Sequence, residues 1–169
     1  LNESVMQSVA RGFPGTFLHA VPVSLRWSLL GSIALAAIGL WYLFQDKTPM
    51  AAGFFASALI FPLTHGLTQW KAVRTGREDF IGLLRADGSV AIVMNLLMIV
   101  SMFLVPQSYF WPLVMLLLIP AVQNVILTMT ALRRIDPQGP AEDGSIAYGV
   151  KTYFYSAFNI VAKHIDKLL

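Results

Sequence analysis

The chain has 169 residues, of which 56% are hydrophobic and only 12% are charged, and its formal net charge is +3. Soluble domains carry about 25% charged residues, and nucleic-acid-binding surfaces need basic residues clustered on a polar face. The composition therefore argues against a soluble domain and against a nucleic-acid partner. Because the chain has no cysteine, a disulfide framework and a thiolate metal site are excluded.

The N-terminal residues 1–25 contain two prolines and two of the chain's glycines in a mixed sequence, which predicts a loop with short helical pieces at the membrane interface. The first membrane span is predicted at residues 27–44, with no charged residue and with tryptophan near both ends, where aromatic rings suit the headgroup layers. Small residues at helical spacing within this span predict a face for close helix packing: Gly31, Ser32, Ala36 and Gly39.

A short polar turn at residues 45–49 leads to a second predicted span at residues 50–69. Pro62 interrupts this span, and a proline inside a membrane helix frees a backbone carbonyl that neighbouring groups must satisfy. We expect Pro62 and His65 either to contact a functional cavity or to belong to an inert kink. The segment Lys71–Phe80 is predicted to be a charged loop, and residues 81–87 to lie at the interface before the next span.

The most apolar stretch is Gly88–Leu132, which has 45 residues and no Asp, Glu, Lys or Arg. A bilayer core needs about 20 apolar residues in a helix, so this stretch is long enough for two crossings. Two prolines in Val105–Pro112 predict the turn between them. We therefore expect a helical hairpin with spans at residues 90–105 and 113–132. The alternative, the core of a large soluble helical protein, would need more polar chain than 169 residues supply.

A polar linker rich in Pro, Gly and acidic residues follows at residues 133–144. A last helix is predicted to begin near Ser145 or Ile146, with an incomplete span at residues 147–169. The N-terminus does not have the pattern of a signal peptide, and the C-terminus stops within a helical pattern. We therefore expect an all-α, polytopic membrane bundle that forms one membrane domain over residues 1–169 of a longer protein.

The distribution of Lys and Arg predicts how the bundle is oriented. Residues 1–26, 71–87 and 133–151 carry nine of them, whereas the opposite loops at 45–49 and 105–112 carry only Lys47. Basic residues concentrate on the cytoplasmic side of membrane proteins. We therefore expect the three basic segments to be cytoplasmic, in a multi-pass protein of the cell membrane.

Several short motifs resemble bacterial polysaccharide-biosynthesis membrane proteins, the lipid-linked oligosaccharide (O-antigen) flippases of the multidrug/oligosaccharidyl-lipid/polysaccharide exporter superfamily. The motifs are weakly specific singly, and their order along nearly the whole chain carries the resemblance. They are Val9-Ala10-Arg11-Gly12 with Thr16-Phe17, Gly76-Arg77 with Phe80, and the string from Asp143 to Leu169. The resemblance implies a twelve-helix transporter of which this chain would supply about helices three to seven.

What the resemblance implies is transport of an undecaprenyl-diphosphate-linked glycan across the cytoplasmic membrane for surface polysaccharide. The partners would be that lipid-linked oligosaccharide, membrane lipid and other polysaccharide-assembly membrane proteins. No enzymatic activity and no cofactor are expected, because the sequence has no intramembrane carboxylate pair, Gly-rich phosphate loop or metal-ligand spacing. Two alternatives stay open: a scaffold or sensor module that does not transport, and a membrane-embedded enzyme of the same pathway.

Two groups of residues are predicted to bind substrate. Arg11 and Arg26 flank the cytoplasmic start of the first span, where a guanidinium could pair with diphosphate oxygens; anchoring by the positive-inside rule explains them equally well. In the last helix, polar residues recur at steps of three and four and form one face. That face is expected to line a central cavity, to hold an internal Lys163–Asp166 salt bridge, or to lie at the interface. Its candidate binding residues are Asn159, Lys163, Asp166 and Lys167.

Overall fold

The computed structural model describes residues 1–105, 110–136 and 139–165, leaving aside the side chains of residues 156–165. Every regular element in these ranges is a helix, so the all-α prediction is confirmed. The helices are α1 (Asn2–Ala10), α2 (Thr16–Phe44), α3 (Thr48–His65), α4 (Gln69–Gly76), α5 (Phe80–Leu104), α6 (Phe110–Arg134) and α7 (Ser145–Ile165).

Four helical stretches in the described part of the chain are long and apolar enough to cross a membrane. They are α2, the stretch Thr48–Gly76 that comprises α3 and α4, α5 and α6. The four complete spans expected from the sequence are thus present as helices. The C-terminal helix α7 is not among them, so the fifth, incomplete span stays a prediction.

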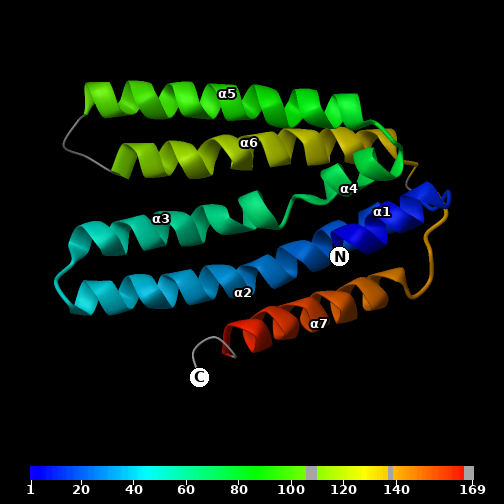
Figure 1. Ribbon diagram of the computed structural model, residues 1–169, viewed down its shortest axis with the longest axis horizontal. Helices are drawn as coiled ribbons and strands as arrows, with labels where there is room; N and C mark the ends of the chain where they lie inside the picture. The colour runs from blue at the N-terminus through cyan, green and yellow to red at the C-terminus, as the bar shows by residue number, and fades with distance from the viewer. Residues whose placement is uncertain (106–109, 137–138, 166–169) are drawn as a thin grey trace.

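Two antiparallel helix hairpins lie against each other (Figure 1). Helices α2 and α3 form the first hairpin, which has the most extensive helix contact, and α5 and α6 form the second hairpin. Helix α3 packs on α6 and so joins the two hairpins. The short helices α1 and α4 pack together at one end of the bundle. Helix α7 runs beside α1 and α2, so segments from both ends of the sequence meet at the end of the bundle that carries α4.

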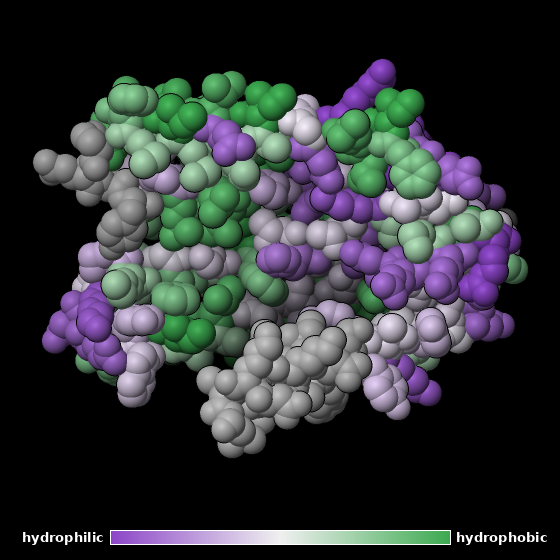
Figure 2. Space-filling view, in the orientation of Figure 1, coloured by the Kyte–Doolittle hydropathy of each residue, from purple (hydrophilic) through white to green (hydrophobic). Residues whose placement is uncertain are grey.

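The bundle exposes an apolar surface along its length and polar residues at its ends (Figure 2). Helix α5 is the clearest case, because Ile92, Leu96 and Phe103 are all more than half exposed. Exposed patches of this extent in a soluble monomer would cause aggregation, whereas lipid covers them in a membrane. The apolar surface and the four long helices together support a membrane-embedded protein.

The prediction for residues 1–25, a loop with short helical pieces, is correct only in part. Nine of these residues form α1, and α2 begins at Thr16, eleven residues before the predicted start at Trp27. Pro22 lies inside α2 and removes one intrahelical hydrogen bond there. Burial of Phe17 and Ala20, both 0% exposed, in the cluster with α1 and α4 offsets that loss. The proline at position 22 suggested a loop, but packing against α1 and α4 makes residues 16–26 helical.

The bounds of the second span and the charged loop after it also need correction. The helix begins at Thr48 and ends at His65, not at residues 50 and 69, and α4 begins after a short break. Lys71 and Arg74, predicted to lie in a loop, therefore belong to a helix. Trp70 and Val73 of α4 are 1% and 4% exposed. Their burial explains why this charged stretch folds as an amphipathic helix.

The predicted hairpin of α5 and α6 is present, with longer helices than the sequence indicated. Helix α5 begins at Phe80, where the Asp79 carboxylate accepts a hydrogen bond from the Gly82 backbone N–H as an N-cap. Residues 81–87 therefore belong to this helix, and their expected interfacial position stays a prediction. Helix α6 extends from Phe110 to Arg134 and includes Pro120. Residues 106–109 of the predicted turn lie outside the described residues.

The small-residue face predicted on α2 packs against α3. A Cβ atom at Gly31 would collide with the Phe61 ring, and one at Gly39 would lie 3.1 Å from the Phe55 ring. Glycine thus lets the aromatic side chains of α3 approach the α2 backbone, as close packing of membrane helices requires. The packing prediction is confirmed at these two positions.

Candidate functional site

The break between α3 and α4 leaves backbone carbonyls without helical partners. Three residues, Gly66, Leu67 and Thr68, separate the two helices. The last carbonyls of any helix lack intrahelical donors, so they need hydrogen-bond donors from neighbouring groups. In this chain one side of the break lies against α6, and the other side lies beside a cavity.

On the α6 side, two polar residues donate hydrogen bonds to backbone carbonyls at and before the break. The Asn124 amide donates to the carbonyl oxygens of Leu63 and Thr64 at 3.3 and 2.8 Å, and its oxygen accepts from Trp70 Nε1 at 2.9 Å. Thr128 Oγ1 donates to the Leu67 carbonyl at 3.0 Å. Asn124 and Thr128 are 4% and 3% exposed. Polar residues in the apolar helix α6 thus hold the broken helix in place.

On the other side lies a cavity of about 680 Å³, bounded by α1, α2, the α3–α4 break and α7. Its volume lies within the roughly 300–1,000 Å³ typical of small-molecule sites. Polar residues of the break and of α2 share its wall with aromatic residues of α2, α3 and α7. The polar wall includes Ser24, Ser28, His65, Thr68 and Gln69, and the aromatic wall includes Trp27, Phe61, Tyr148, Tyr153 and Phe154.

Gln69, the first residue of α4, has the most unusual polar group in this wall. Its side chain is 2% exposed, and its Nε2 donates to Ser24 Oγ at 2.6 Å. Its Oε1 is buried and has no hydrogen-bond partner in the part of the chain that the structure describes. An unpaired buried amide oxygen costs about 1–3 kcal/mol, and Gln69 carries this cost on the cavity side of the break.

The aromatic side chains of the cavity contact one another both between helices and within one helix. The rings of Trp27 and Phe154 meet edge to face with centroids 5.4 Å apart, which joins α2 to α7. The Phe61 and His65 rings lie 4.4 Å apart on α3. Trp27 is 45% exposed and is one of the residues that line the cavity. His65, weighed from the sequence as a possible cavity residue, does line this cavity.

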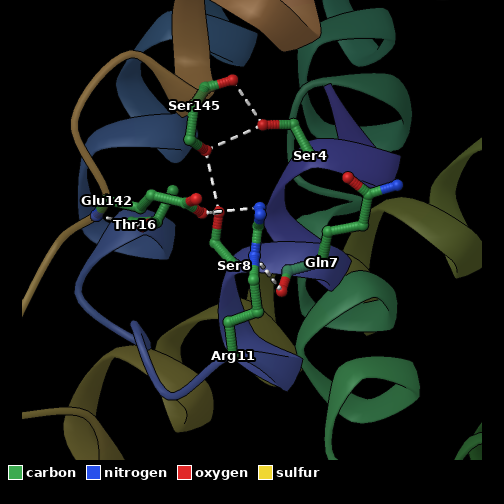
Figure 3. A network of polar contacts seen from close by, with 7 residues as sticks. All are labelled: Ser4, Gln7, Ser8, Arg11, Thr16, Glu142 and Ser145. Carbon is green, nitrogen blue, oxygen red and sulfur yellow. Dashed lines mark hydrogen bonds and ion pairs between the residues drawn. The ribbon is translucent and has the colours of Figure 1, made fainter.

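Of the predicted substrate-binding arginines, Arg11 is engaged in an internal network (Figure 3). Its Nη2 lies 2.8 Å from Glu142 Oε2, which also accepts a hydrogen bond from Ser8 Oγ at 2.6 Å. Ser4 and Ser8 of α1 contact the Ser145 hydroxyl, each at 2.8 Å. The network joins α1 to the linker and to the start of α7, and Arg11 belongs to this joint instead of the cavity wall.

The other basic residues also lie away from the cavity wall. Arg26 is exposed on α2 and is not part of the lining. Lys71 pairs with Asp87 at 2.8 Å and Arg74 with Asp79 at 3.6 Å, and both cations lie over the Trp70 ring. The acidic residue among those that line the cavity is Glu3, and the N-terminal residue Leu1 lies in the same wall. The cavity wall thus contains no Lys or Arg among its described residues.

Most residues of the predicted polar face of the last helix are not among the described side chains. The backbone of Asn159 and Lys163 lies in α7, but their side chains are not among those described, and Asp166 and Lys167 lie beyond the described residues. The expected cavity-lining, salt-bridge or interfacial role of this face stays a prediction. Nearer its start, α7 places Thr152, Tyr153 and Phe154 on the cavity.

Sequence reasoning missed Gln69 and Ser24 as site residues, because each is an unremarkable polar residue near the end of a predicted span. A glutamine at the edge of an apolar run, seven residues after Pro62, was the signal that could have directed attention there. Among the described residues no group of three or more His, Cys, Asp or Glu could hold a metal ion. Comparisons with family models, curated proteins and solved structures find no match for this chain.

Proposed function

We propose that this chain is part of a membrane transporter that moves lipid-linked oligosaccharide, an undecaprenyl-diphosphate glycan, across the bacterial cell membrane. The observation that carries the proposal is the cavity beside the broken helix α3–α4. Discontinuous helices that line a polar cavity are a recurring feature of transporters, because unwound backbone and short helix ends supply polar groups to the binding site. The order of short motifs along the chain supports the same class.

The twelve-helix architecture and the cytoplasmic position of the basic end belong to this proposal. Arg11, Lys71 and Arg74 all lie at the α1–α4 end of the bundle, and Lys47 lies at the α2–α3 turn at the opposite end. Reporter fusions after Lys47 should report the outside, and fusions after Gly76 the cytoplasm. A cytoplasmic signal after Lys47 would contradict the orientation and the proposed direction of transport.

Deletion of the encoding gene in its host distinguishes the transporter from the two alternatives. Loss of a flippase leaves completed lipid-linked glycan on the inner leaflet, while surface polysaccharide disappears. Loss of a membrane-embedded enzyme leaves an incomplete glycan, and loss of a scaffold leaves precursor on both leaflets with disordered assembly. Periodate oxidation of intact cells, compared with lysed cells, reports the leaflet. Completed precursor accessible in intact mutant cells would overturn the proposal.

A further inference from the structure

Helix α5 lies at one edge of the bundle, and most of its surface is exposed (Figure 1). Its contacts in the described part of the chain are chiefly with α6 and α4, and Ser101 is its buried residue. The exposed surface is mostly apolar and suits lipid. Asn95 is different, because it carries an exposed amide group within this apolar helix.

The position of Asn95 along α5 places its amide deep in the membrane. The last charged residue before it is Asp87, and the helix ends at Leu104. At a rise of about 1.5 Å per residue, Asn95 lies about 12 Å beyond Asp87 and about 14 Å before Leu104. The apolar part of α5 therefore crosses a hydrocarbon core of about 30 Å with Asn95 near its centre. Lipid offers no hydrogen-bonding group at that depth.

Helix α5 itself satisfies only part of the Asn95 amide. Asn95 Nδ2 donates to the Ala91 carbonyl at 2.7 Å, and a side-chain amide has two N–H donors and an acceptor oxygen. One N–H and the oxygen therefore remain for a partner outside α5. Asn124 of α6 shows the opposite arrangement, because it is 4% exposed and makes three hydrogen bonds inside the bundle.

The residues on the same face as Asn95 have the spacing of a helix–helix seam. Six positions follow one another at alternating steps of four and three, the heptad spacing that keeps residues on one face of paired helices. We call this set the Asn95 face: Leu84, Gly88, Ala91, Asn95, Met98 and Met102. None of the six is buried, and Leu84 and Met102 are 74% and 59% exposed. A single asparagine in such a seam specifies register and the number of helices.

A second copy of the protein matches this face directly. Copies in one membrane share the same orientation, so a two-fold axis along the membrane normal places two parallel α5 helices side by side with each residue near its counterpart. Asn95 then meets Asn95 of the second copy at the same depth. Each amide brings a donor and an acceptor, so the pair forms reciprocal hydrogen bonds. A helix of another kind would need its own polar group at that depth.

We propose that the protein forms a two-fold homodimer in the membrane through the Asn95 face of α5, with the two Asn95 amides paired at its centre. Small residues at positions 88 and 91 let the two helices approach closely. No described residue of α5 lines the cavity, so the dimer leaves the cavity wall free. The dimer would suit a transporter, a scaffold or an enzyme, so a result against transport leaves it unaffected.

Disulfide cross-linking in membranes of cells that express the protein tests the face. The sequence contains no cysteine, so Ala91→Cys and Met102→Cys each place a thiol on the Asn95 face. Leu96→Cys is the matched control, because Leu96 is 57% exposed on another side of α5. A disulfide requires Cα atoms within about 7 Å. We expect a covalent dimer from Ala91→Cys and Met102→Cys on oxidation, and monomer from Leu96→Cys.

Two results would overturn the proposal. An equal yield of dimer at Leu96 would show that the copies meet by random collision. Absence of a dimer at Ala91 or at Met102 would show that lipid or a different helix covers the face.

Variants of Asn95 test the polar centre of the dimer. Energy transfer between donor-labelled and acceptor-labelled copies in vesicles, followed as added lipid dilutes the protein, gives the dissociation constant. Asn95→Leu should weaken the dimer about three- to thirty-fold, the effect of losing an interhelical hydrogen bond in a membrane. Asn95→Gln keeps the amide and should weaken it less. Unchanged dimerisation of Asn95→Leu, or an equal loss in both variants, would refute the amide pair. The cross-linking result stands alone if Asn95→Leu fails to fold by circular dichroism.

Discussion

The two sides of the α3–α4 break differ in how completely their polar groups are paired. On the α6 side, Asn124 makes three hydrogen bonds and Thr128 one, all with the broken helix. On the cavity side, Gln69 is just as buried, yet one of its amide atoms has no partner. Stability alone favours complete pairing. The contrast therefore assigns a structural role to the α6 side and leaves the cavity side of the break incompletely paired.

The largest expected effect on the free energy of unfolding is that of replacing Asn124. Asn124→Leu removes three hydrogen bonds and leaves Trp70 Nε1 and two carbonyls unpaired, so we expect a loss of about 2–4 kcal/mol in the free energy of unfolding. Reversible unfolding in bicelles, followed by circular dichroism, measures it. A loss below about 0.5 kcal/mol would show that the α6 side does not hold the break.

Gly66 tests how tightly the break packs on α2. A Cβ atom there would lie 2.5 Å from the Pro62 carbonyl oxygen and 2.6 Å from Ser28 Oγ. The backbone oxygen cannot move away, so Gly66→Ala should cost about 1–3 kcal/mol. Gly88→Ala is the matched control, because a Cβ atom at Gly88 meets nothing within 4 Å and alanine favours the helix. Equal stability of the two variants in the same unfolding assay would contradict the close approach.

A smaller effect is expected at Thr128. Thr128→Val keeps the shape of the side chain and removes one hydrogen bond to the Leu67 carbonyl, which should cost about 0.6–1.7 kcal/mol in a membrane protein. Thr130→Val is the control, since Thr130 donates to the Ile126 carbonyl within its own helix. The thermal midpoint of unfolding should be lower for Thr128→Val than for Thr130→Val. A larger decrease of the midpoint for Thr130→Val would contradict the assigned role of Thr128.

On the cavity side, Gln69→Leu should change stability by less than about 1 kcal/mol. The variant loses the bond to Ser24 but also removes an unpaired buried oxygen, and the two contributions oppose each other. Comparison with Asn124→Leu in the same unfolding assay sharpens the contrast between the two sides. A loss at Gln69 as large as that at Asn124 would mean that both sides are structural.

The smallest effect is expected for the network around Arg11. Its side chain is 56% exposed, and exposed ion pairs contribute about 0–1 kcal/mol. A double-mutant cycle of Arg11→Gln and Glu142→Gln should therefore give a coupling energy below about 1 kcal/mol. A larger coupling would show that the joint between α1 and α7 is as structural as the α6 side of the break.

The amino-acid sequence by itself determined the membrane character of the chain and the position of most of its helices. Long uncharged runs such as Gly88–Leu132 are helical in lipid because a helix pairs every backbone group within the segment and each half of this run is long enough to cross a bilayer. The length of this uncharged run also predicted the α5–α6 hairpin, and the glycines at 31 and 39 predicted the face of α2 that packs on α3.

Tertiary structure decided the helix bounds and the site. Residues 16–26 are helical because Phe17 and Ala20 are buried against α1 and α4. Local helix propensity contains no information about contacts with these distant segments. The pairing of Asn124 with the break, and of Gln69 with Ser24, joins residues 60 and 45 positions apart in the chain. Hydrogen bonds over such separations depend on how helices pack, so a sequence pattern with a period of three or four residues cannot specify them.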